Sequence, residues 1–135
     1  MSETILSDDW LRAARFALDG LSRRQEVIGQ NLANADTPGY LAQKVDFEST
    51  LHRALSGPQD VALSTTQRGH LGMLGGLRPL IQVSARQGGT LRADGNDVDL
   101  DTELVQMSET DLRYEALTRL VDQKFNLLRE IASRR

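Results

Sequence analysis

Apolar residues in the first third of the chain recur at alternating steps of three and four positions. The members of this series are Leu11, Ala14, Leu18, Leu21, Ile28, Leu32 and Ala35. Only Gln25 interrupts it. Such spacing places one apolar seam along a helix, as in a coiled-coil heptad. Ser7, Asp8 or Asp9 can cap the start, because side-chain oxygens accept hydrogen bonds from the first backbone N–H groups. The pattern predicts a helix over residues 8–34.

A second and wider apolar stripe occupies the C-terminal third of the chain. Its seven-residue repeat consists of Leu100, Met107, Tyr114, Val121 and Leu128, and it is flanked by Leu104, Leu117, Leu120, Phe125, Leu127 and Ile131. This pattern predicts a helix over residues 100–133. Asp101 or Thr102 is the expected cap of that helix. A helix of this kind is about 45 Å long or more.

The middle of the chain, residues 46–95, has no sustained period. Phe47, Leu51 and Leu55 follow helical spacing, which predicts a short helix over residues 45–55 that ends at Ser56-Gly57-Pro58. Beyond it, glycines punctuate the chain and only residues 80–83 have strand character. We expect an irregular, loop-rich segment that holds the short helix and, beyond it, either a small hairpin or local disorder.

Turn-forming residues follow the first predicted helix. Pro38 fixes φ for the second position of a turn, and Gly39 can adopt the positive φ that a type II turn requires next. Thr37 is biased towards extended geometry because it precedes proline. Asn34 bonds nearby backbone more readily at a helix end than in a helix interior. These residues predict a helix stop and a tight turn within residues 35–45.

This turn also carries a recognisable signature. The segment Asn31–Tyr40, Asn-Leu-Ala-Asn-Ala-Asp-Thr-Pro-Gly-Tyr, resembles the N-terminal signature of flagellar rod and hook proteins, which is roughly Asn-x-Ala-Asn-x-x-Thr-Pro-Gly-Tyr. The matching positions are Asn31, Ala33, Asn34, Thr37, Pro38, Gly39 and Tyr40. Leu41 departs from the family, which usually has a polar or basic residue there. The short length and the continuation Lys44–Glu48 are most similar to proximal rod members.

The C-terminal third is similar to the same family. Residues 95–103, Gly-Asn-Asp-Val-Asp-Leu-Asp-Thr-Glu, and the following segment 107–114 resemble the C-terminal signature of rod proteins. Ser108 and Thr110 stand where the family usually has Ala and Asn. A hydrogen bond that this Asn makes in the family is therefore expected to differ in this chain.

The resemblance implies a structural subunit of the proximal rod of the bacterial flagellar basal body, which transmits torque and encloses the export channel. It implies other rod subunits, the rod-to-membrane-ring adaptor and the flagellar export gate as partners in a homo-oligomeric or hetero-oligomeric helical assembly. It also implies a periplasmic location, reached through the flagellar type III system without a cleaved signal peptide. Another proximal rod component, or a cytoplasmic helical export chaperone or adaptor, is the alternative.

Residues 1–135 are expected to form one rod-type domain of mainly α class, in which the terminal helices pack as an antiparallel coiled coil. The expected contacts join Leu11, Leu18, Leu21, Ile28 and Leu32 to Leu104, Met107, Tyr114, Leu117, Val121 and Leu128. The C-terminal stripe is too broad for one partner helix to cover, and exposed apolar surface of this kind marks association. A head-to-tail contact that does not close produces a helical assembly. The Asn31–Tyr40 stretch is expected to shape the turn and to contact adjacent subunits.

Composition and local chemistry argue against other classes of function. The net charge of −3 argues against a nucleic-acid surface, for which a basic stripe is expected, and the chain has no cysteine for a thiolate metal site. The N-terminus lacks the basic and apolar regions of a signal peptide. No apolar run approaches the roughly 20 residues that span a bilayer.

Metal and catalytic interpretations fail on spacing. A calcium loop that begins at Asp94 would place Val98 at position 5 and Val105 at position 12, and one that begins at Asp97 would place Ser108 at position 12. Gly72–Leu77 lacks the Lys-Ser/Thr of a phosphate loop. No nucleophile elbow or activating context accompanies the two histidines. We therefore expect a non-enzyme without metal or cofactor.

Overall fold

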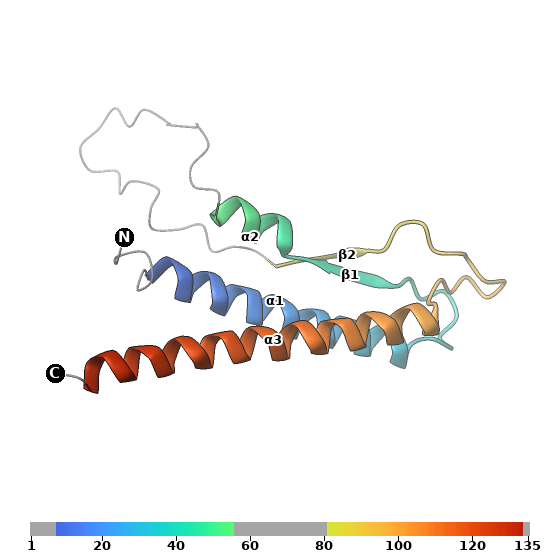
Figure 1. The fold of residues 1–135 in the computed structure, drawn as a ribbon. Coiled ribbons are helices and arrows are strands. Elements are labelled where there is room, and N and C mark those ends of the chain that lie inside the picture. Colours follow the sequence, from blue (N-terminus) through green and yellow to red (C-terminus); the bar gives the residue numbers. More distant parts are fainter. Residues whose placement is uncertain (1–7, 56–80, 134–135) are drawn as a thin grey trace, which may run out of the picture.

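The computed structural model describes residues 8–55 and 81–133. In chain order its elements are α1 (Asp8–Ala33), β1 (Gln43–Asp46), α2 (Glu48–Leu55), β2 (Gln82–Ala85) and α3 (Leu100–Ser133). Helices α1 and α3 lie side by side along the molecule, and the two strands and α2 lie on the other side of α1 (Figure 1). The mainly helical class, with long terminal helices and a loop-rich middle, is confirmed. The predicted cap at Ser7, Asp8 or Asp9 lies outside the described side chains.

Helices α1 and α3 run in opposite directions. Asn31 bonds Glu103 near the end of α1, and Gln25 bonds Asp111 one to two turns earlier in α1. At the far end, the Lys124 ammonium lies 5.8 Å from the centroid of the Trp10 ring. Residue numbers therefore fall along α1 as they rise along α3. The packing of these helices as a coiled coil stays a prediction.

The strands form a two-stranded antiparallel sheet that pairs distant parts of the chain. Gln43 lies opposite Ala85, and Asp46 lies opposite Gln82. Neither β1 nor this pairing was predicted, and no hairpin of neighbouring strands occurs within residues 8–55 and 81–133. Strand character expected over residues 80–83 is found two residues later, in β2.

The start of α2 also differs from the prediction. The expected helix over residues 45–55 begins only at Glu48, because Asp46 caps it: its Oδ1 accepts hydrogen bonds from the backbone N–H and the hydroxyl of Ser49, at 3.3 and 3.1 Å. A capping residue keeps non-helical backbone, which leaves Val45 and Asp46 free to join β1. The predicted helix stop at Ser56-Gly57-Pro58 lies outside the described residues.

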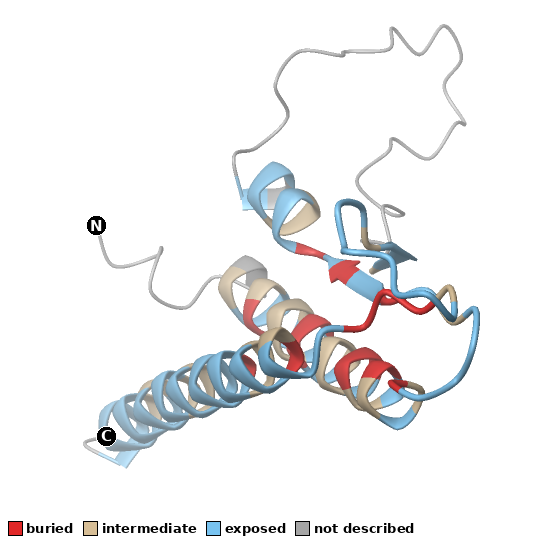
Figure 2. Cartoon of the chain, turned by 90° about the vertical axis from the view of Figure 1, so that its right-hand side faces the viewer, coloured by how far each residue is buried: buried red, intermediate tan, exposed pale blue. Residues whose placement is uncertain are grey.

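The apolar core is small and follows α1 (Figure 2). Its larger cluster consists of Leu21, Val27, Val45 and Phe47, with Phe16, Ala17, Ile81 and Leu117 packed against it. A second cluster joins Ala35, Ala42 and Val98, with Tyr40 against it. Most of α3 beyond its first turns is exposed (Figure 2). The single chain therefore buries α1 far better than α3.

Two glycines of α1 differ in the space around them, so replacing each with alanine should change the stability of the fold in opposite directions. A Cβ at Gly20 would lie 2.6 Å from Cδ2 of the buried Phe47 ring, whereas a Cβ at Gly29 would meet nothing within 4 Å. Gly20→Ala is expected to lower the free energy of unfolding by about 1–3 kcal/mol through overpacking. Gly29→Ala should raise it by up to about 1 kcal/mol, the difference in helix propensity. Urea titration of both variants tests this, and an equal gain in both would show that Phe47 does not pack on Gly20.

Candidate functional site

The signature turn closes immediately after α1. The backbone N–H of Thr37 donates to the Asn34 carbonyl at 3.0 Å, and that of Tyr40 donates to the Thr37 carbonyl at 3.2 Å. Gly39 has a φ of 75°, the left-handed value that the turn prediction requires. The helix stop and the tight turn are therefore present where the sequence predicts them.

Asn31 holds the end of α1 to the strand that follows the turn. Its side chain is fully buried, and its amide makes four hydrogen bonds. The Nδ2 group donates to the Gln43 carbonyl at 2.8 Å and to Glu103 Oε2 at 3.2 Å. The Oδ1 atom accepts from the Gln43 N–H at 2.9 Å and from the Tyr40 hydroxyl at 3.1 Å. Both donors and both acceptor positions of the amide are thus in use.

Asn96, a residue of the C-terminal signature, also holds two segments of the chain together through a buried side-chain amide. It is fully buried, and its Nδ2 group donates to the carbonyls of Asn34 and Thr37, both at 2.9 Å. Its Oδ1 atom accepts from the Val98 N–H at 2.7 Å. One side chain therefore ties two carbonyls of the N-terminal turn to the approach of α3.

Further contacts join the same two segments. The Gly39 N–H donates to the Asp94 carbonyl at 2.9 Å, and the Ala42 N–H donates to Asp97 Oδ1 at 2.6 Å. The Arg92 guanidinium donates to the Ala35 carbonyl at 3.1 Å. We call the contact between residues 31–43 and residues 92–103 the signature junction. The two family signatures bind each other within one chain.

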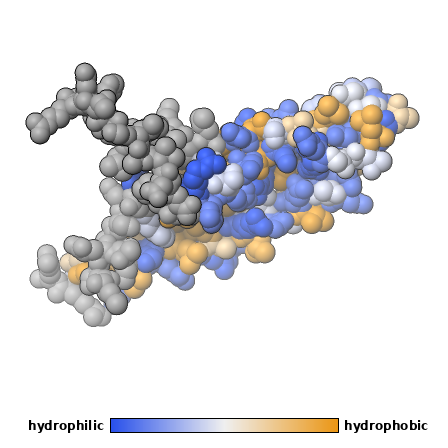
Figure 3. All heavy atoms as spheres, turned by 90° about the horizontal axis from the view of Figure 1, so that it is seen from above, coloured by the Kyte–Doolittle hydropathy of each residue, from blue (hydrophilic) through white to orange (hydrophobic). Residues whose placement is uncertain are grey.

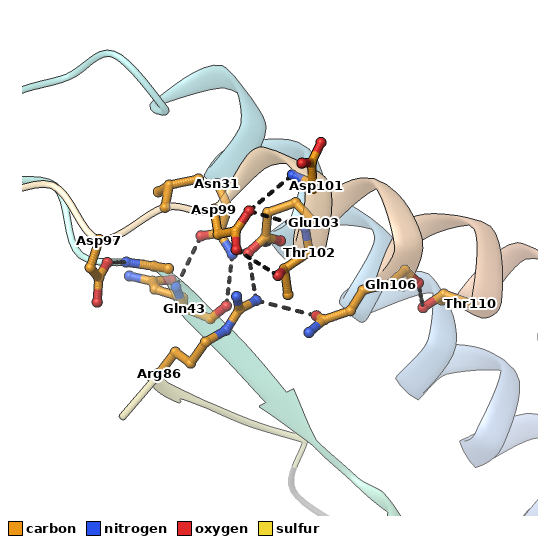
Figure 4. A network of polar contacts seen from close by, with 12 residues as sticks. Asn31, Gln43, Arg86, Asp97, Asp99, Asp101, Thr102, Glu103, Gln106 and Thr110 are labelled. Carbon is orange, nitrogen blue, oxygen red and sulfur yellow. Dashed lines mark hydrogen bonds and ion pairs between the residues drawn. The ribbon is translucent and has the colours of Figure 1, made fainter. Parts of the chain in front are cut away.

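A buried ion pair lies beside this junction (Figure 4). Glu103 is fully buried on α3, and its Oε1 atom lies 2.5 Å from the guanidinium of Arg86, the residue that follows β2. Arg86 also donates to the Gln106 side chain at 3.2 Å and, from its backbone N–H, to the Ala42 carbonyl at 2.7 Å. Since Asn31 donates to the other Glu103 oxygen, this carboxylate connects α1, α3 and the sheet.

The junction favours the protonated form of Tyr40. Burial raises the pKa of the Tyr40 hydroxyl above its usual value of 10.0, and the nearby carboxylates of Glu103 and Asp97 raise it further. Only the protonated hydroxyl can donate to Asn31 Oδ1. The hydrogen bond and the pKa direction therefore agree.

Asp99 is the N-cap of α3, in place of the predicted Asp101 or Thr102. Its Oδ1 atom accepts from the N–H groups of Asp101 and Thr102 at 3.1 and 3.3 Å, and its Oδ2 atom accepts from the Thr102 hydroxyl at 2.9 Å. The helix begins at Leu100, two residues earlier than a cap at Asp101 allows. Asn96 and Asp97 hold the preceding backbone to the turn, which decides where the helix starts.

This cap predicts a loss of stability in acid. The hydrogen bonds from the Thr102 hydroxyl and backbone lower the pKa of Asp99 below its ordinary value of 3.8. A lowered pKa in the folded state stabilises the fold above the unfolded pKa, and the contribution disappears as the pH falls through the folded value. Asp99→Asn keeps an acceptor oxygen but does not titrate, so its thermal midpoint should change less between pH 6 and pH 3 than that of the unmodified chain. Parallel curves would contradict this role.

The structure places the predicted site residues at different depths. Within the signature, Asn31 is buried, Asn34 and Tyr40 are partly buried, and Ala33, Thr37, Pro38 and Gly39 are exposed. Within the predicted packing seams, Leu21 and Ile28 are buried, and Leu18, Leu32, Met107, Leu117, Val121 and Leu128 are partly buried. Exposed in this chain are Leu11, Leu104 and Tyr114. Leu41 is also exposed.

Thr110, one of the two departures from the family signature, is buried on α3. Its hydroxyl donates to the Gln106 carbonyl at 2.7 Å, and Ser108 donates to the Leu104 carbonyl at 3.0 Å. Both hydroxyls bond the backbone of their own helix rather than another element.

The residues that sequence analysis did not assign a role are Asn96, Arg86, Arg92 and Glu103. A signal for Glu103 was present, because it lies seven residues before Thr110 and 14 before Leu117, on the face of α3 that packs against α1. An acid on an apolar face needs a buried partner. Nothing local identifies Arg86 as that partner. In the described residues, no three His, Cys, Asp or Glu side chains are grouped as a metal site would require.

Comparison with known proteins agrees with these features. The family described as "Flagella basal body rod protein" matches residues 11–40. The chain is 37% identical over 112 residues to flagellar basal body rod protein FlgB of Escherichia coli (strain K12), a match that covers 80% of this chain and 81% of the relative. It is 34% identical over 114 residues to FlgB of Borrelia hermsii, covering 80% and 84%. It is 31% identical over 115 residues to FlgB of Bacillus subtilis (strain 168), covering 85% and 86%.

The paired terminal helices and the signature junction define a structural subunit of the flagellar rod class. More narrowly, the chain belongs to the FlgB family of flagellar basal body rod proteins. Membership of this family supports a location of the chain in the flagellar basal body. Among residues 8–55 and 81–133, no helix is long and apolar enough to cross a membrane.

Proposed function

We propose that this chain is a structural subunit of the proximal rod, assembling with other rod subunits into the axial structure that transmits torque and encloses the export channel. The observation that carries the proposal is the apolar surface that remains on α3 after it pairs with α1. Leu104, Leu112 and Leu120 are 53%, 67% and 55% exposed. Hydrophobic side chains reach the surface at several places in Figure 3. Exposed apolar area on this scale is typical of a protein that is completed by neighbours.

The mode of assembly follows from the two helices and the turn. In this proposal α1 and α3 form a coiled-coil unit, with Leu11, Leu104 and Tyr114 covered by adjacent subunits. The exposed part of the signature, Thr37 to Gly39, contacts the next subunit, while Asn31 and Asn96 fix its shape from within. Since the turn is held by the same chain, each copy presents the same rigid edge to its neighbour.

Further partners and the route to the rod are part of the proposal. The rod-to-membrane-ring adaptor and the flagellar export gate are its other partners, and the chain leaves the cell through the flagellar type III system without a cleaved signal peptide. It acts without catalysis, metal or cofactor, and it does not bind nucleic acid. The names of the relatives, which are flagellar basal body rod proteins, support a structural and non-catalytic role.

Removing the conformational restriction of the turn tests the function. Gly39 has a φ of 75°, which residues with a Cβ rarely adopt, and Pro38 presets the preceding position. Replacing Pro38-Gly39 with Ala-Ala is expected to abolish or strongly reduce swimming while the protein is still produced. The assay is motility in soft agar, with the amount of the chain in isolated basal bodies measured by immunoblot. Ser22→Ala, at an exposed position of α1 away from the turn, is the control. Normal motility of the Ala-Ala variant would contradict the proposal.

Cell fractionation separates the alternatives. A rod subunit should be recovered with purified basal bodies, whereas a cytoplasmic export chaperone or adaptor should remain in the soluble cytoplasmic fraction. Another proximal rod component would also be recovered with basal bodies. Complementation of a strain that lacks FlgB distinguishes that case, because only a FlgB subunit should restore swimming.

A further inference from the structure

A groove of about 310 Å³ lies between α1, β1 and α3. Val27 and Ile28, which are buried, form part of its wall, and most of the other lining residues are polar. Leu11, Leu104 and Tyr114, which the proposed function leaves to adjacent subunits, do not line it. The groove is therefore a separate surface at which the chain can receive a partner.

Three cationic side chains from three different elements line this groove. Arg24 comes from α1, Lys44 from β1 and Arg113 from α3. The Glu48 carboxylate lies 2.6 Å from the Arg24 guanidinium and 3.6 Å from that of Arg113. Glu109 lies 2.5 Å from the Arg113 guanidinium. Within the described residues the Lys44 ammonium has no ion pair, so one positive charge of the groove is left uncompensated. We call this surface the basic groove.

The signature junction, at one end of the molecule, carries the opposite charge (Figure 1). Residues 31–43 and 86–103 contain six carboxylates and only two cations, namely Asp36, Asp94, Asp97, Asp99, Asp101 and Glu103 against Arg86 and Arg92. Asp36 lies at the exposed edge of the signature turn, next to Thr37. Its side chain makes no hydrogen bond or ion pair within residues 8–55 and 81–133. The turn therefore presents an unpaired carboxylate to solvent.

We propose that the basic groove receives the exposed edge of the signature turn of a second copy, with the Asp36 carboxylate of that copy beside the Lys44 ammonium. This inference rests on the proposed function and adds to it the place on the neighbouring subunit at which the turn binds. A groove of this volume accommodates a few residues of a tight turn, whereas a helix, which is about 10–12 Å across with its side chains, is too wide for it.

The contact joins two different surfaces of the chain and is therefore heterologous. Each copy gives its turn to one neighbour and its groove to another, and a contact of this kind builds an open helical assembly when its rotation does not close. Charge also disfavours the symmetric alternatives. Turn against turn places two Asp36 carboxylates together, and groove against groove places two Lys44 ammonium groups together, whereas turn against groove joins opposite charges.

Cysteine pairs test which surfaces meet, because the chain has no cysteine of its own. Asp36→Cys and Lys44→Cys are produced on separate, differently tagged chains in the same cells, so that a disulfide between the two tags can form only between copies. Mild oxidation of isolated basal bodies is expected to join the two tags, and a reducing agent should separate them. Asp19→Cys, at an exposed position of α1, replaces Asp36→Cys in the matched control and should not be joined to Lys44→Cys. Equal cross-linking of both pairs, or of neither, would overturn the proposal.

An exchange of the two charges tests the chemistry of the contact. Lys44→Glu and Asp36→Lys are each expected to lower the amount of the chain in isolated basal bodies about tenfold or more, because each places like charges together. The double variant Asp36→Lys/Lys44→Glu restores opposite charges between copies and should recover most of the original amount. Asp19→Lys, on α1 and outside the junction, is the control for charge reversal and should leave the amount nearly unchanged. Circular dichroism of the purified variants should match that of the unmodified chain, since neither side chain is bonded within the described residues.

Two results of the charge exchange would overturn the proposal. Normal incorporation of Lys44→Glu would show that the groove does not receive the turn. Loss of both single variants without recovery in the double variant would show that the groove binds an acidic segment of another partner in place of Asp36. Neither result affects the rod function, which is judged by the Pro38-Gly39 variant and by the presence of the unmodified chain in basal bodies. If the unmodified chain were absent from basal bodies, the proposed function itself would fail.

Discussion

Arg86→Met is expected to lower the free energy of unfolding by about 3–5 kcal/mol, the usual cost of removing one partner from a buried ion pair. The Glu103 carboxylate is buried, and Arg86 is the one guanidinium paired with it in the described residues. Methionine retains much of the apolar stem of arginine, so the expected change reports mainly the lost charge and hydrogen bonds. Chemical denaturation monitored by circular dichroism gives the measurement.

The double variant Arg86→Met/Glu103→Leu supplies the decisive comparison. Replacing both members of a buried pair with apolar residues is often neutral or stabilising, so this variant should recover most of the stability lost in Arg86→Met. Arg119→Met removes a pair with Glu115 whose side chains are 73% and 60% exposed, and it should change stability by about 1 kcal/mol or less. Equal losses in Arg86→Met and Arg119→Met would show that the Glu103 pair is not buried in solution.

Asn31→Leu is expected to cost about 3 kcal/mol, because it keeps the branched shape of the side chain but removes its four hydrogen bonds. The Gln43 N–H and the fully buried Glu103 carboxylate then each lose a partner. The signature junction should loosen as a unit. Hydrogen exchange at Gln43 should therefore accelerate more than exchange in the middle of α3.

Asn126→Leu is the control for this substitution, since Asn126 is exposed on α3. It should leave the midpoint of denaturation nearly unchanged. If Asn31→Leu proved as stable as Asn126→Leu, the amide of Asn31 would not be the polar centre of the junction.

The long helices and the turn could be predicted because their causes are local. The spacing of apolar residues over 8–34 and 100–133 is a property of consecutive positions, and the structure begins and ends α1 and α3 within one residue of these ranges. The same holds for Gly39, whose positive φ follows from its place after Pro38. Resemblance to flagellar rod proteins was also readable there, because the signature lies in one continuous stretch.

Strand β1 and the true helix caps could not be predicted in this way. Phe47, Leu51 and Leu55 follow a spacing that suits a helix, but Asp46 caps α2, and Ala85 to Gln82 supply the ladder for β1 from a distant part of the chain. Asp99 rather than Asp101 caps α3 because Asn96 and Asp97 are tied to the N-terminal turn. The β1 ladder and the start of α3 depend on partners that lie far away in sequence, whereas Asp46 caps α2 through Ser49, three residues on.

The sequence by itself determined two amphipathic helices, the stop between α1 and the turn, and membership of a rod-protein family. Only the tertiary structure decided that the two signatures bind each other and that Glu103 is paired with Arg86 inside the fold. The physical reason is the range of the interactions. Helix periodicity and turn geometry act over a few residues, whereas a buried amide or carboxylate is satisfied by whichever distant group the folded chain brings to it.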